Sequence, residues 1–426
     1  MNLKQELESR GLLNQFTSEE VFDLYTKGGQ SFYIGFDPSA DSLQLGNMCA
    51  IMAAVNLMKY GNKCYYLVGG ATGMIGDPGG RDAERNFLTE EILRHNEKSI
   101  FNQLKGFLDN LKANYGINFD FEMVNNYDFY KDMTILDFFR DVGKYITVNN
   151  MIKKETVARR IEDPDKSISY TEFSYMLLQG YDFVKLFKEK GILLQLAGGD
   201  QWGNAVTGAE LIRKILDKEG YVLTIPIVTD ANGKKFGKSA GNAVWLDPNK
   251  NSPYFVYQFF MNVADADVER YMKILTLLSL EEIADIMKKQ NEKPELRFGQ
   301  SALGKAVVEI IFGKKATLQV EMITDMLFGD KDKLEVLKTL GEDDLKALAK
   351  ETGSSTFSGN IQVLDALINT GLATSRGDGK KLIEGGGIFL NEVKVEDSSR
   401  EITEKDFING AIILRKGKKN FKLILK

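Results

Sequence analysis

Alternating apolar and polar positions divide the first 240 residues into short buried strands and amphipathic helices. The pattern predicts helices over 3–11, 19–27, 45–60, 90–111 and 169–182. It predicts strands over 31–36, 63–68, 192–196 and 221–228. Strands that alternate with helices are typical of a parallel, doubly wound sheet. The predicted fold class is therefore α/β, with a Rossmann-like sheet domain.

Changes of this pattern set the predicted domain boundaries. We expect the sheet domain over 1–240, with an insertion rich in aromatic and charged residues over about 119–165. A helical pattern predicts a second domain over 241–327, and more frequent glycines and charges predict a linker over 328–354. Residues 355–426 combine a strand–turn–strand with basic stretches, which predicts a small α+β domain that contacts an RNA backbone.

Composition and charge narrow the class of protein. With 426 residues, 43% hydrophobic and 27% charged, the chain is typical of a soluble globular protein of two or three domains. Because no apolar run is long enough for a bilayer and no signal-peptide core follows Met1, we expect a cytoplasmic location and no membrane partner. The net charge of −5 argues against a uniformly basic nucleic-acid binder, but it allows local basic patches. Cys49 and Cys64 suffice for neither a disulfide framework nor a zinc site.

The single histidine excludes several mechanisms. Neither a Ser-His-Asp triad nor a histidine-ligated metal can form without His95. In the helix predicted over 90–111, His95 falls nearly opposite the apolar face. That face holds Ile92, Leu93, Ile100, Leu104, Leu108 and Leu111. We therefore expect His95 to be solvated rather than catalytic, and no bound metal.

Polar, glycine-rich loops follow the predicted strands. The first strand breaks at Asp37-Pro38 and passes through Ser39 into the helix over 45–60. A strand that enters a helix through such a loop presents backbone N–H groups to phosphates, although many such loops bind nothing. The loop over 69–78 lacks the glycine spacing of a dinucleotide-binding fold. Arg81 and Arg85 follow it on a polar segment, where simple surface exposure is the ordinary alternative.

Two further segments carry candidate chemistry. On the helix over 169–182, Tyr175, Gln179 and Asp182 stand at i, i+4 and i+7, so three polar tips share one face. Their apolar neighbours favour a pocket lining over a surface stripe. The loop over 233–239 ends in Gly-Lys-Ser, but the Walker pattern requires glycine where Asn232 stands, which disfavours a P-loop.

The loop segments Gln44-Leu45-Gly46-Asn47 and Lys235-Phe236-Gly237-Lys238-Ser239 together resemble the two signature motifs of class I aminoacyl-tRNA synthetases. The residues around them resemble a bacterial-type tyrosyl-tRNA synthetase along nearly the whole chain. The resemblance implies activation of tyrosine with ATP to tyrosyl-adenylate and pyrophosphate, then transfer to the 3′ end of tRNA(Tyr). It also implies a homodimer, Mg²⁺ held mainly by the nucleotide, and no role for DNA. Both histidines of the first motif are replaced, by Gln44 and Asn47, which keep amide donors.

The resemblance assigns an expected role to each matching residue. Those expected to act in catalysis are Lys235, Lys238, Gln44, Asn47, Arg81 and Arg85. Those expected to bind tyrosine are Tyr33, Asp77, Tyr175, Gln179, Asp182, Gln195 and Gln201. Those expected to bind ATP are Gly35, Asp37, Ser39, Gly46, Gly198, Asp200, Lys235 and Lys238. A phenol that donates to a carboxylate and accepts from a second phenol would exclude phenylalanine, because buried partners would be left unpaired.

Two alternatives stay open. The first is a non-catalytic RNA-binding paralogue, against which the retained Tyr33, Asp182 and both motif lysines argue. The second is a related synthetase for tryptophan, against which the tyrosine-type pocket and the basic tail argue. The tail also resembles the small domain shared by a ribosomal small-subunit protein and some RNA-modifying enzymes. Gly379 and Glu392 stand where that domain usually has alanine and glycine, which implies weaker RNA binding.

Overall fold

The computed structural model describes residues 1–78, 88–116, 119–163, 165–239, 242–329, 332–356, 359–417 and 420–426. Their contacts divide the chain into two compact units, Met1–Gly313 and Lys314–Lys426. The helices predicted over 241–327 are present, but they divide between the two units.

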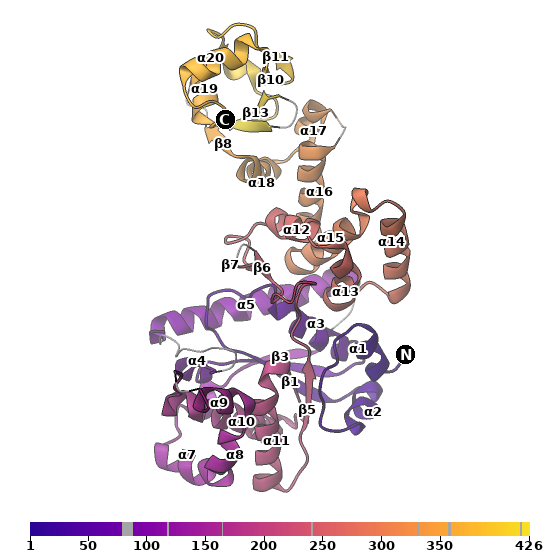
Figure 1. Ribbon diagram of the computed structural model, residues 1–426, viewed down its shortest axis with the longest axis vertical. Coiled ribbons are helices and arrows are strands. Elements are labelled where there is room, and N and C mark those ends of the chain that lie inside the picture. The colour runs from indigo at the N-terminus through magenta and orange to yellow at the C-terminus, as the bar shows by residue number, and fades with distance from the viewer. Residues whose placement is uncertain are drawn as a thin grey trace. The chain divides into compact units, whose positions relative to one another are not determined.

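A five-stranded parallel sheet lies at the centre of the first unit (Figure 1). Its strands are β1 (Ser31–Phe36), β2 (Lys63–Val68), β3 (Phe121–Asn125), β4 (Leu194–Gly198) and β5 (Tyr221–Ile225). Their spatial order is β3-β2-β1-β4-β5, and all four neighbouring pairs are parallel. The predicted α/β fold with a doubly wound sheet is confirmed, and β1 and β2 have the predicted bounds. Strand β3 was predicted as part of an insertion, but it pairs with β2 and forms the edge of the sheet.

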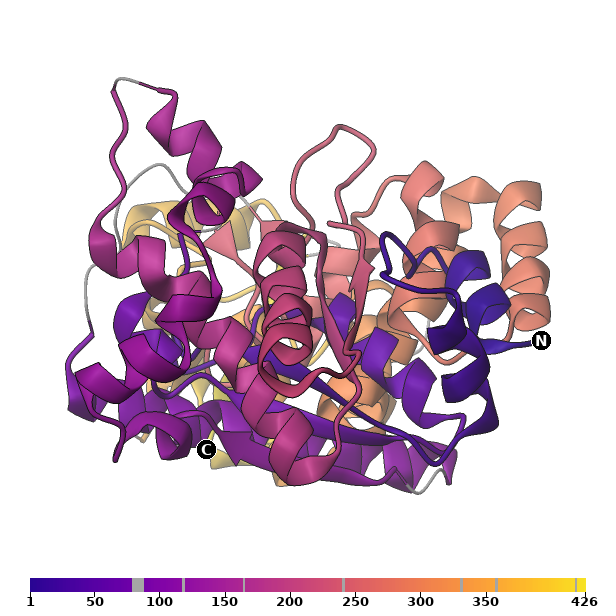
Figure 2. The ribbon, with the colours of Figure 1, turned by 90° about the horizontal axis from the view of Figure 1, so that it is seen from below.

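Helices cover both faces of this sheet, as Figures 1 and 2 show. The helices before β4 are α1 (Leu3–Ser9), α2 (Glu20–Lys27), α3 (Asn47–Met58), α4 (Thr72–Ile75), α5 (Glu90–Tyr115), α6 (Tyr127–Tyr130), α7 (Ile135–Asp141), α8 (Val148–Ile152), α9 (Glu155–Ile161) and α10 (Tyr170–Lys190). Those after it are α11 (Trp202–Leu216), α12 (Pro253–Met261), α13 (Asp265–Leu275), α14 (Leu280–Glu292) and α15 (Phe298–Phe312). The short strands β6 (Lys238–Ser239) and β7 (Asn242–Ala243) form a separate antiparallel pair.

The distribution of apolar residues explains which helices are buried. Helix α3 is apolar on every side and buried over almost its whole length, because it lies between the sheet and α13. Helices α10 and α11 cover the opposite face, where Met176 and Phe183 join a core with Tyr33 of β1. On α5, His95 is exposed as predicted. Ile92 was predicted on the buried face of α5, but it is 47% exposed because it lies in the first turn, outside the contact with the sheet.

The second unit contains two small sheets and five α-helices among its described residues. Its helices are α16 (Lys314–Phe328), α17 (Lys333–Thr339), α18 (Glu342–Thr352), α19 (Val363–Asn369) and α20 (Arg376–Glu384). Its strands are β8 (Ser354–Thr356), β9 (Ile361–Gln362), β10 (Ile388–Leu390), β11 (Val393–Lys394), β12 (Glu401–Ile402), β13 (Ala411–Lys416) and β14 (Asn420–Leu425). The larger sheet has the order β11-β10-β13-β14-β8, and β12 pairs with β9.

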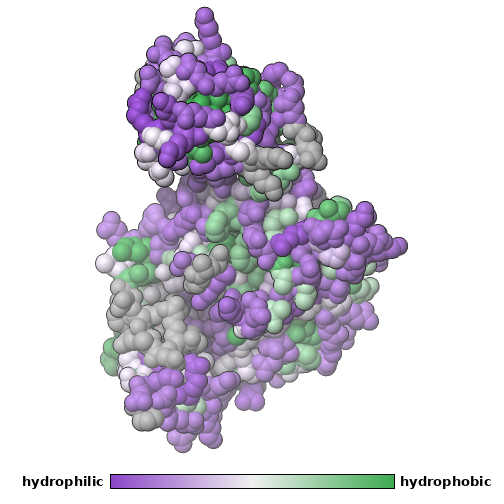
Figure 3. Space-filling view, turned by 45° about the horizontal axis from the view of Figure 1, so that its top comes forward, coloured by the Kyte–Doolittle hydropathy of each residue, from purple (hydrophilic) through white to green (hydrophobic). Residues whose placement is uncertain are grey.

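The predicted linker over 328–354 is largely helical. Leu345 and Leu348 of α18 are buried, so this charged segment contributes apolar side chains to packing within the second unit. Its charges lie on the outer side of the helix, which explains why composition alone suggested a linker. The predicted strand–turn–strand is present as β10 and β11, with Asn391 and Glu392 at positive φ in its turn. Figure 3 shows a face of the molecule that is mostly hydrophilic, with smaller hydrophobic areas.

Candidate active site

Two buried polar side chains stand side by side where the strand order of the parallel sheet reverses. Tyr33 on β1 is in register with Gln195 on β4, and both are almost fully buried. Among the residues that the structure describes, neither the Tyr33 hydroxyl nor the Gln195 Oε1 has a hydrogen-bond partner. Leaving a buried polar group unpaired is unfavourable by about 1–3 kcal/mol. Two such groups at the reversal point, where open α/β sheets bind ligands, indicate a pocket for a polar ligand.

Gly35 leaves the same face of β1 uncovered. It lies two residues beyond Tyr33, so it faces the same side of the sheet, and it is exposed although its strand is central. A glycine inside a strand often marks a place where a ligand approaches the backbone closely. The polar loops that follow β1 and β4 carry Ser39, Gly198 and Asp200, and of these Ser39 and Asp200 are exposed.

Asp182 is a buried carboxyl group on α10 near Tyr33. The Asn126 amide donates to its Oδ2 atom at 2.9 Å, and the Tyr130 hydroxyl lies 2.8 Å from its Oδ1 atom. Burial raises the pKa of Asp182 to about 8, although the contacts with Asn126 and Tyr130 act in the opposite direction. Burial, and then the charge of Asp182, raise the pKa of Tyr33 well above its ordinary value of 10.0. This end of the pocket therefore combines a carboxyl group with an unpaired phenol.

Four polar side chains form a second network, which joins α10, the loop after β2 and the start of α11. The Gln201 amide donates to Asp77 Oδ2 at 2.6 Å. The Asn204 Nδ2 atom lies 3.1 Å from both Gln179 Oε1 and Gln201 Oε1. The Asp77 carboxylate and the side-chain oxygens of Gln179 and Gln201 are all acceptors, which suits an ammonium group as the ligand. The resemblance assigned Asp77, Tyr175 and Gln179 to the ammonium group and Gln201 to the same pocket. The network contains Asp77, Gln179 and Gln201, whereas the Tyr175 hydroxyl donates to Asp37.

Asp37 connects the carboxyl end of β1 to α10. Its two carboxylate oxygens accept hydrogen bonds from Thr72 Oγ1 at 2.7 Å and from the Tyr175 hydroxyl at 2.8 Å. Burial, and then the charge of Asp37, raise the pKa of Tyr175 well above 10.0. A Cβ atom at Gly69 would lie only 2.1 Å from Asp37 Oδ1, so this approach of the two loops requires glycine. The sequence assigned Asp37 to ATP and Tyr175 to tyrosine, and a direct hydrogen bond joins the two.

The two signature segments contact each other through their backbones. The Leu45 N–H donates to Val244 O at 2.8 Å, and the Val244 N–H donates to Gly237 O at 2.9 Å. Gly237 has a φ of +84°, and a Cβ atom there would lie 2.8 Å from the Gly46 nitrogen. Glycine is therefore needed at position 237 for both its conformation and its close contact. The fold therefore brings the two motifs together.

Gln44 and Asn47 lie at the start of α3. The Asn47 Oδ1 atom accepts a hydrogen bond from the Gln44 N–H at 2.9 Å, which stabilises the turn before the helix. Within the described part of the chain, the side-chain NH₂ groups of both residues make no hydrogen bond. Both residues are half-buried. They therefore present two neutral donors next to the lysine loop.

The lysine loop is anchored by an aromatic side chain. Phe236 is buried, with its ring centroid 4.7 Å from that of Tyr271 and 6.0 Å from that of Phe259. Lys235 and Lys238, on either side of it, are exposed, and no carboxylate among the described residues pairs with them. The anchor fixes the backbone while both ammonium groups stay available to an anion.

Helix α13 holds the base of this loop. The Asp267 carboxylate accepts a hydrogen bond from the Ala231 N–H at 2.8 Å, and the Tyr271 hydroxyl donates to Thr229 O at 3.1 Å. The Asp230 carboxylate accepts from the Lys234 N–H at 2.8 Å and closes the turn. These contacts position the loop next to the first signature segment.

Sequence reasoning missed several residues that the structure places in this site. They are Thr72, Asn126, Tyr130 and Asn204. Asn126 follows the last residue of β3, so a polar residue at a strand end was the available signal. That signal was hidden because β3 was assigned to an insertion. The predicted Arg81 and Arg85 lie outside the described residues.

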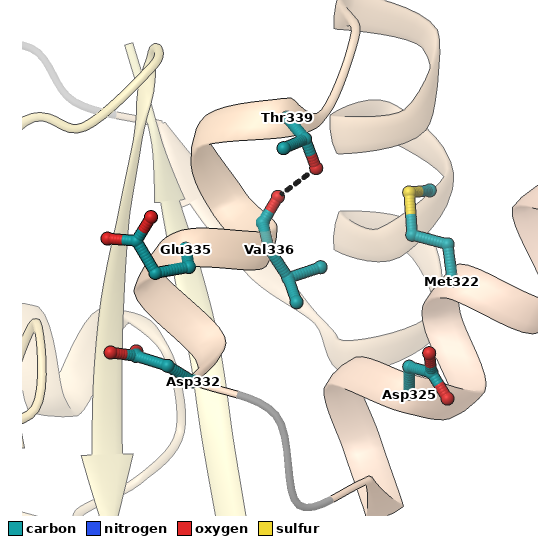
Figure 4. Close-up of a pocket in the computed structure, with 6 residues that line it drawn as sticks. All are labelled: Met322, Asp325, Asp332, Glu335, Val336 and Thr339. Carbon is teal, nitrogen blue, oxygen red and sulfur yellow. Dashed lines mark hydrogen bonds between the residues drawn. The ribbon is translucent and has the colours of Figure 1, made fainter.

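A hollow in the second unit has a different character from this site. In the second unit, a hollow between α16 and α17 is lined by Met322, Asp325, Asp332, Glu335, Val336 and Thr339 (Figure 4). Its three carboxylates disfavour an anionic ligand. No group of three or more His, Cys, Asp or Glu side chains among the described residues could hold a metal ion. None of the described helices is long and apolar enough to cross a membrane.

Comparisons with known proteins agree with this arrangement. Residues 26–329 match the family described as tRNA synthetases class I (W and Y), and residues 344–424 match the tyrosine–tRNA ligase SYY-like C-terminal domain. The tyrosine–tRNA ligase of Streptococcus uberis is 43% identical over 428 residues, covering 100% of both chains. That of Streptococcus gordonii is 44% identical over 425 residues, covering 99% of each. A C-terminally truncated mitochondrial tyrosyl-tRNA synthetase of Aspergillus nidulans superposes with a TM-score of 0.70 at 31% identity, covering 77% of this chain and 94% of that one.

Proposed function

The chain belongs to the class I tRNA synthetases for tryptophan and tyrosine, and we propose that it ligates tyrosine to tRNA(Tyr). In this reaction the tyrosine carboxylate attacks the α-phosphate of ATP, pyrophosphate leaves, and the tyrosyl group passes from the adenylate to the 3′ end of the tRNA. The observation that carries the proposal is the unpaired, buried Tyr33 hydroxyl beside Asp182. A substrate phenol fits this pair because it can accept from one group and donate to the other.

The ammonium group of tyrosine has a matching place in the proposed pocket. Asp77 supplies a negative charge, and Gln179 and Gln201 supply amide oxygens. With both ends of the amino acid held, its carboxylate is directed toward the loops at the carboxyl ends of β1 and β4. Such positioning lowers the entropic part of the activation barrier, because the two reactants no longer need to find each other.

The phosphates of ATP are assigned to the two signature segments. Lys235 and Lys238 neutralise the charge that develops on the leaving pyrophosphate, and Gln44 and Asn47 donate from their amides. Gly35, Gly46 and Gly198 leave room for the nucleotide, with Ser39, Asp37 and Asp200 at its edge. Mg²⁺ is proposed to arrive on the phosphates, which need no dedicated protein ligands for it. It would neutralise phosphate charge there.

We further propose that the protein binds tRNA, forms a homodimer and acts in the cytoplasm. The basic residues of the second unit, such as Lys380 and Lys381 on α20, are assigned to the tRNA backbone. Helices α7, α8 and α9 carry several exposed apolar side chains. These are Ile135, Leu136, Phe139, Val148, Ile152 and Ile161. An apolar surface of this kind supports homodimer formation. Sedimentation at micromolar concentration, with Leu136→Lys as the variant, tests that assignment.

Amino-acid-dependent exchange of pyrophosphate into ATP tests the proposed activity. Exchange with tyrosine, and none with tryptophan or phenylalanine, is the expected result. Exchange with tryptophan alone would assign the chain to the other specificity of its family. Charging of tRNA after exchange then tests the second step. No exchange with any amino acid would favour the non-catalytic alternative.

A further inference from the structure

The Tyr130 hydroxyl lies within hydrogen-bond distance of two oxygen atoms. It is 2.7 Å from the backbone oxygen of Leu178 and 2.8 Å from Asp182 Oδ1. Both are hydrogen-bond distances for O–H···O. A phenol carries one proton, so it can donate along only one of these two contacts.

The Leu178 carbonyl oxygen decides along which of the two contacts Tyr130 donates its proton. A carbonyl can only accept, so a short contact with the phenol oxygen is favourable only if Tyr130 donates to it. The second contact then needs a proton on Asp182 Oδ1, directed at the phenol oxygen. The Asn126 amide donates to Asp182 Oδ2, which leaves that oxygen in the carbonyl role. When Asp182 is neutral, each of these three contacts has one donor and one acceptor.

We propose that Tyr130 is a positioning residue that holds Asp182 as a neutral carboxyl group, both in the free protein and with tyrosine bound. The second part rests on the proposed function, because it assigns the substrate phenol to this carboxyl group. The phenol donates to a remaining lone pair of Asp182 and accepts from the unpaired Tyr33 hydroxyl. No covalent bond changes, and no proton leaves the site.

The surroundings of Asp182 favour the neutral form. The titratable groups that face it are Tyr33 from β1, Tyr130 from α6, Tyr175 from its own helix, and Asp37 from the loop after β1. None is a cation, and no lysine or arginine among the described residues forms an ion pair with Asp182. Burial and the charge of Asp37 raise the pKa of Asp182, whereas hydrogen bonds that Asn126 and Tyr130 donate to a carboxylate lower it. In the proposed arrangement Tyr130 accepts from Asp182 instead, so its contact no longer favours the charged form. The substrate ammonium is assigned to Asp77, at the other end of the pocket.

Infrared difference spectroscopy of the unliganded, full-length protein tests the first part. At neutral pH the wild type is expected to show a C=O band of a protonated carboxyl group that is absent from Asp182→Asn and shifts in D₂O. As a function of pH this band should disappear with a midpoint well above 3.8, the ordinary value of an aspartate carboxyl group. Absence of the band at neutral pH would overturn the proposal. A sample labelled with ¹³C at the aspartate carboxyl carbons gives the same titration if Asp182→Asn does not fold.

The direction of a shift in Tyr130→Phe separates the two arrangements. If Tyr130 accepts the carboxyl proton, removing its hydroxyl destabilises the neutral form, and the midpoint moves to lower pH. If Tyr130 instead donates to a carboxylate, removing it destabilises the charged form, and the midpoint moves up. A downward shift supports the proposal, and an upward shift overturns it. Tyr127→Phe is the matched control on the same short helix, because the Tyr127 hydroxyl makes no hydrogen bond within the described residues.

Calorimetry of tyrosine binding at neutral pH, in buffers that differ in ionisation enthalpy, tests the second part. The expected result is that binding releases no proton. Release of about one proton would show that Asp182 ionises in the complex, and it would overturn this part. The infrared outcome is independent of the proposed function, whereas the calorimetric one requires that tyrosine binds. A protein that lacks the infrared band but catalyses tyrosine-dependent exchange would retain the function and lose the inference.

Discussion

The two ends of the candidate active site differ in how their polar groups are satisfied. At the buried end, Asp182 is held by Asn126 and Tyr130, while the Tyr33 hydroxyl and Gln195 Oε1 find no partner in the part of the chain that the structure describes. At the exposed end, Lys235 and Lys238 have no carboxylate partner among the described residues. A buried hydrogen-bond partner penalises every ligand that leaves it unpaired, so the buried end suits selection. Solvent and salt screen the exposed ammonium groups of Lys235 and Lys238 until a phosphate binds next to them. The loop therefore suits stabilisation of the negative charge that develops on the phosphates during the reaction.

The largest expected effect concerns selection at the buried end. Wild-type protein should activate tyrosine in preference to phenylalanine by about 10⁴ or more, because phenylalanine leaves Tyr33 and Asp182 unpaired. The ratio of kcat/KM values in pyrophosphate exchange measures this preference. Tyr33→Phe should lower the ratio. If phenylalanine were used within about tenfold of tyrosine, the buried end would not be the phenol subsite.

The next effect concerns the exposed end. Lys238→Ala should slow adenylate formation by about 10²–10³, the usual loss when one group that stabilises transition-state charge is removed. Tyrosine binding should change little, since the ammonium group acts on phosphate rather than on the amino acid. Pre-steady-state fluorescence gives both quantities. Lys234→Ala is the control, because Lys234 is an exposed neighbour outside the signature. Equal losses in rate and in tyrosine affinity would show that the lysine loop also contributes to tyrosine binding. This result would contradict the separate roles of the buried and exposed ends.

A smaller effect is expected from the two amides that replace histidines. Removal of the Gln44 or Asn47 side chain should slow adenylate formation by about 10- to 100-fold, the value of a hydrogen bond to a charged group at roughly 1.5–3 kcal/mol. Asn47→Ala also removes the acceptor for the Gln44 N–H, so it should be the more harmful of the two.

The pH profile of the same rate adds a control. Since no histidine lies among the described residues of the site, the rate should show no inflection near pH ~6.5. An inflection that disappears in His95→Gln would place the exposed His95 in the mechanism. Wild-type rates in both Gln44→Ala and Asn47→Ala would mean that the lysines and the backbone N–H groups alone stabilise the charge on the phosphates.

The last prediction concerns the stability of the folded protein. The pKa of Asp182 is raised from 3.8 to about 8 in the folded protein. Between these values the folded state binds a proton that the unfolded state does not, so the contribution of this group to the free energy of unfolding falls as the pH rises. It is fully present below pH 3.8 and lost as the pH rises through about 8. Thermal melting from pH ~5 to pH ~8 should therefore show a larger decrease for wild type than for Asp182→Asn. An equal decrease would mean that Asp182 is ionised in the folded protein.

The sequence by itself determined those features that depend on local periodicity. The bounds of β1 and β2 agree with the pattern, because burial on a strand is read from the alternation of nearby residues. The face shared by Tyr175, Gln179 and Asp182 follows from helical spacing in the same way. The glycine motifs and the lysine loop could be recognised because each occupies a continuous stretch.

Only the tertiary structure decided which of these stretches meet. The contact between Gly237 and Gly46, and the register of Tyr33 with Gln195, join positions far apart in the chain. Periodicity says that a residue is buried, but it does not say against what. Asn126 and Tyr130 were missed for the same reason, because their roles depend on β3 pairing at the edge of the sheet. Whether the Asp182 carboxyl group is protonated depends on such long-range contacts. That a carboxyl group stands at this position is known from the sequence alone.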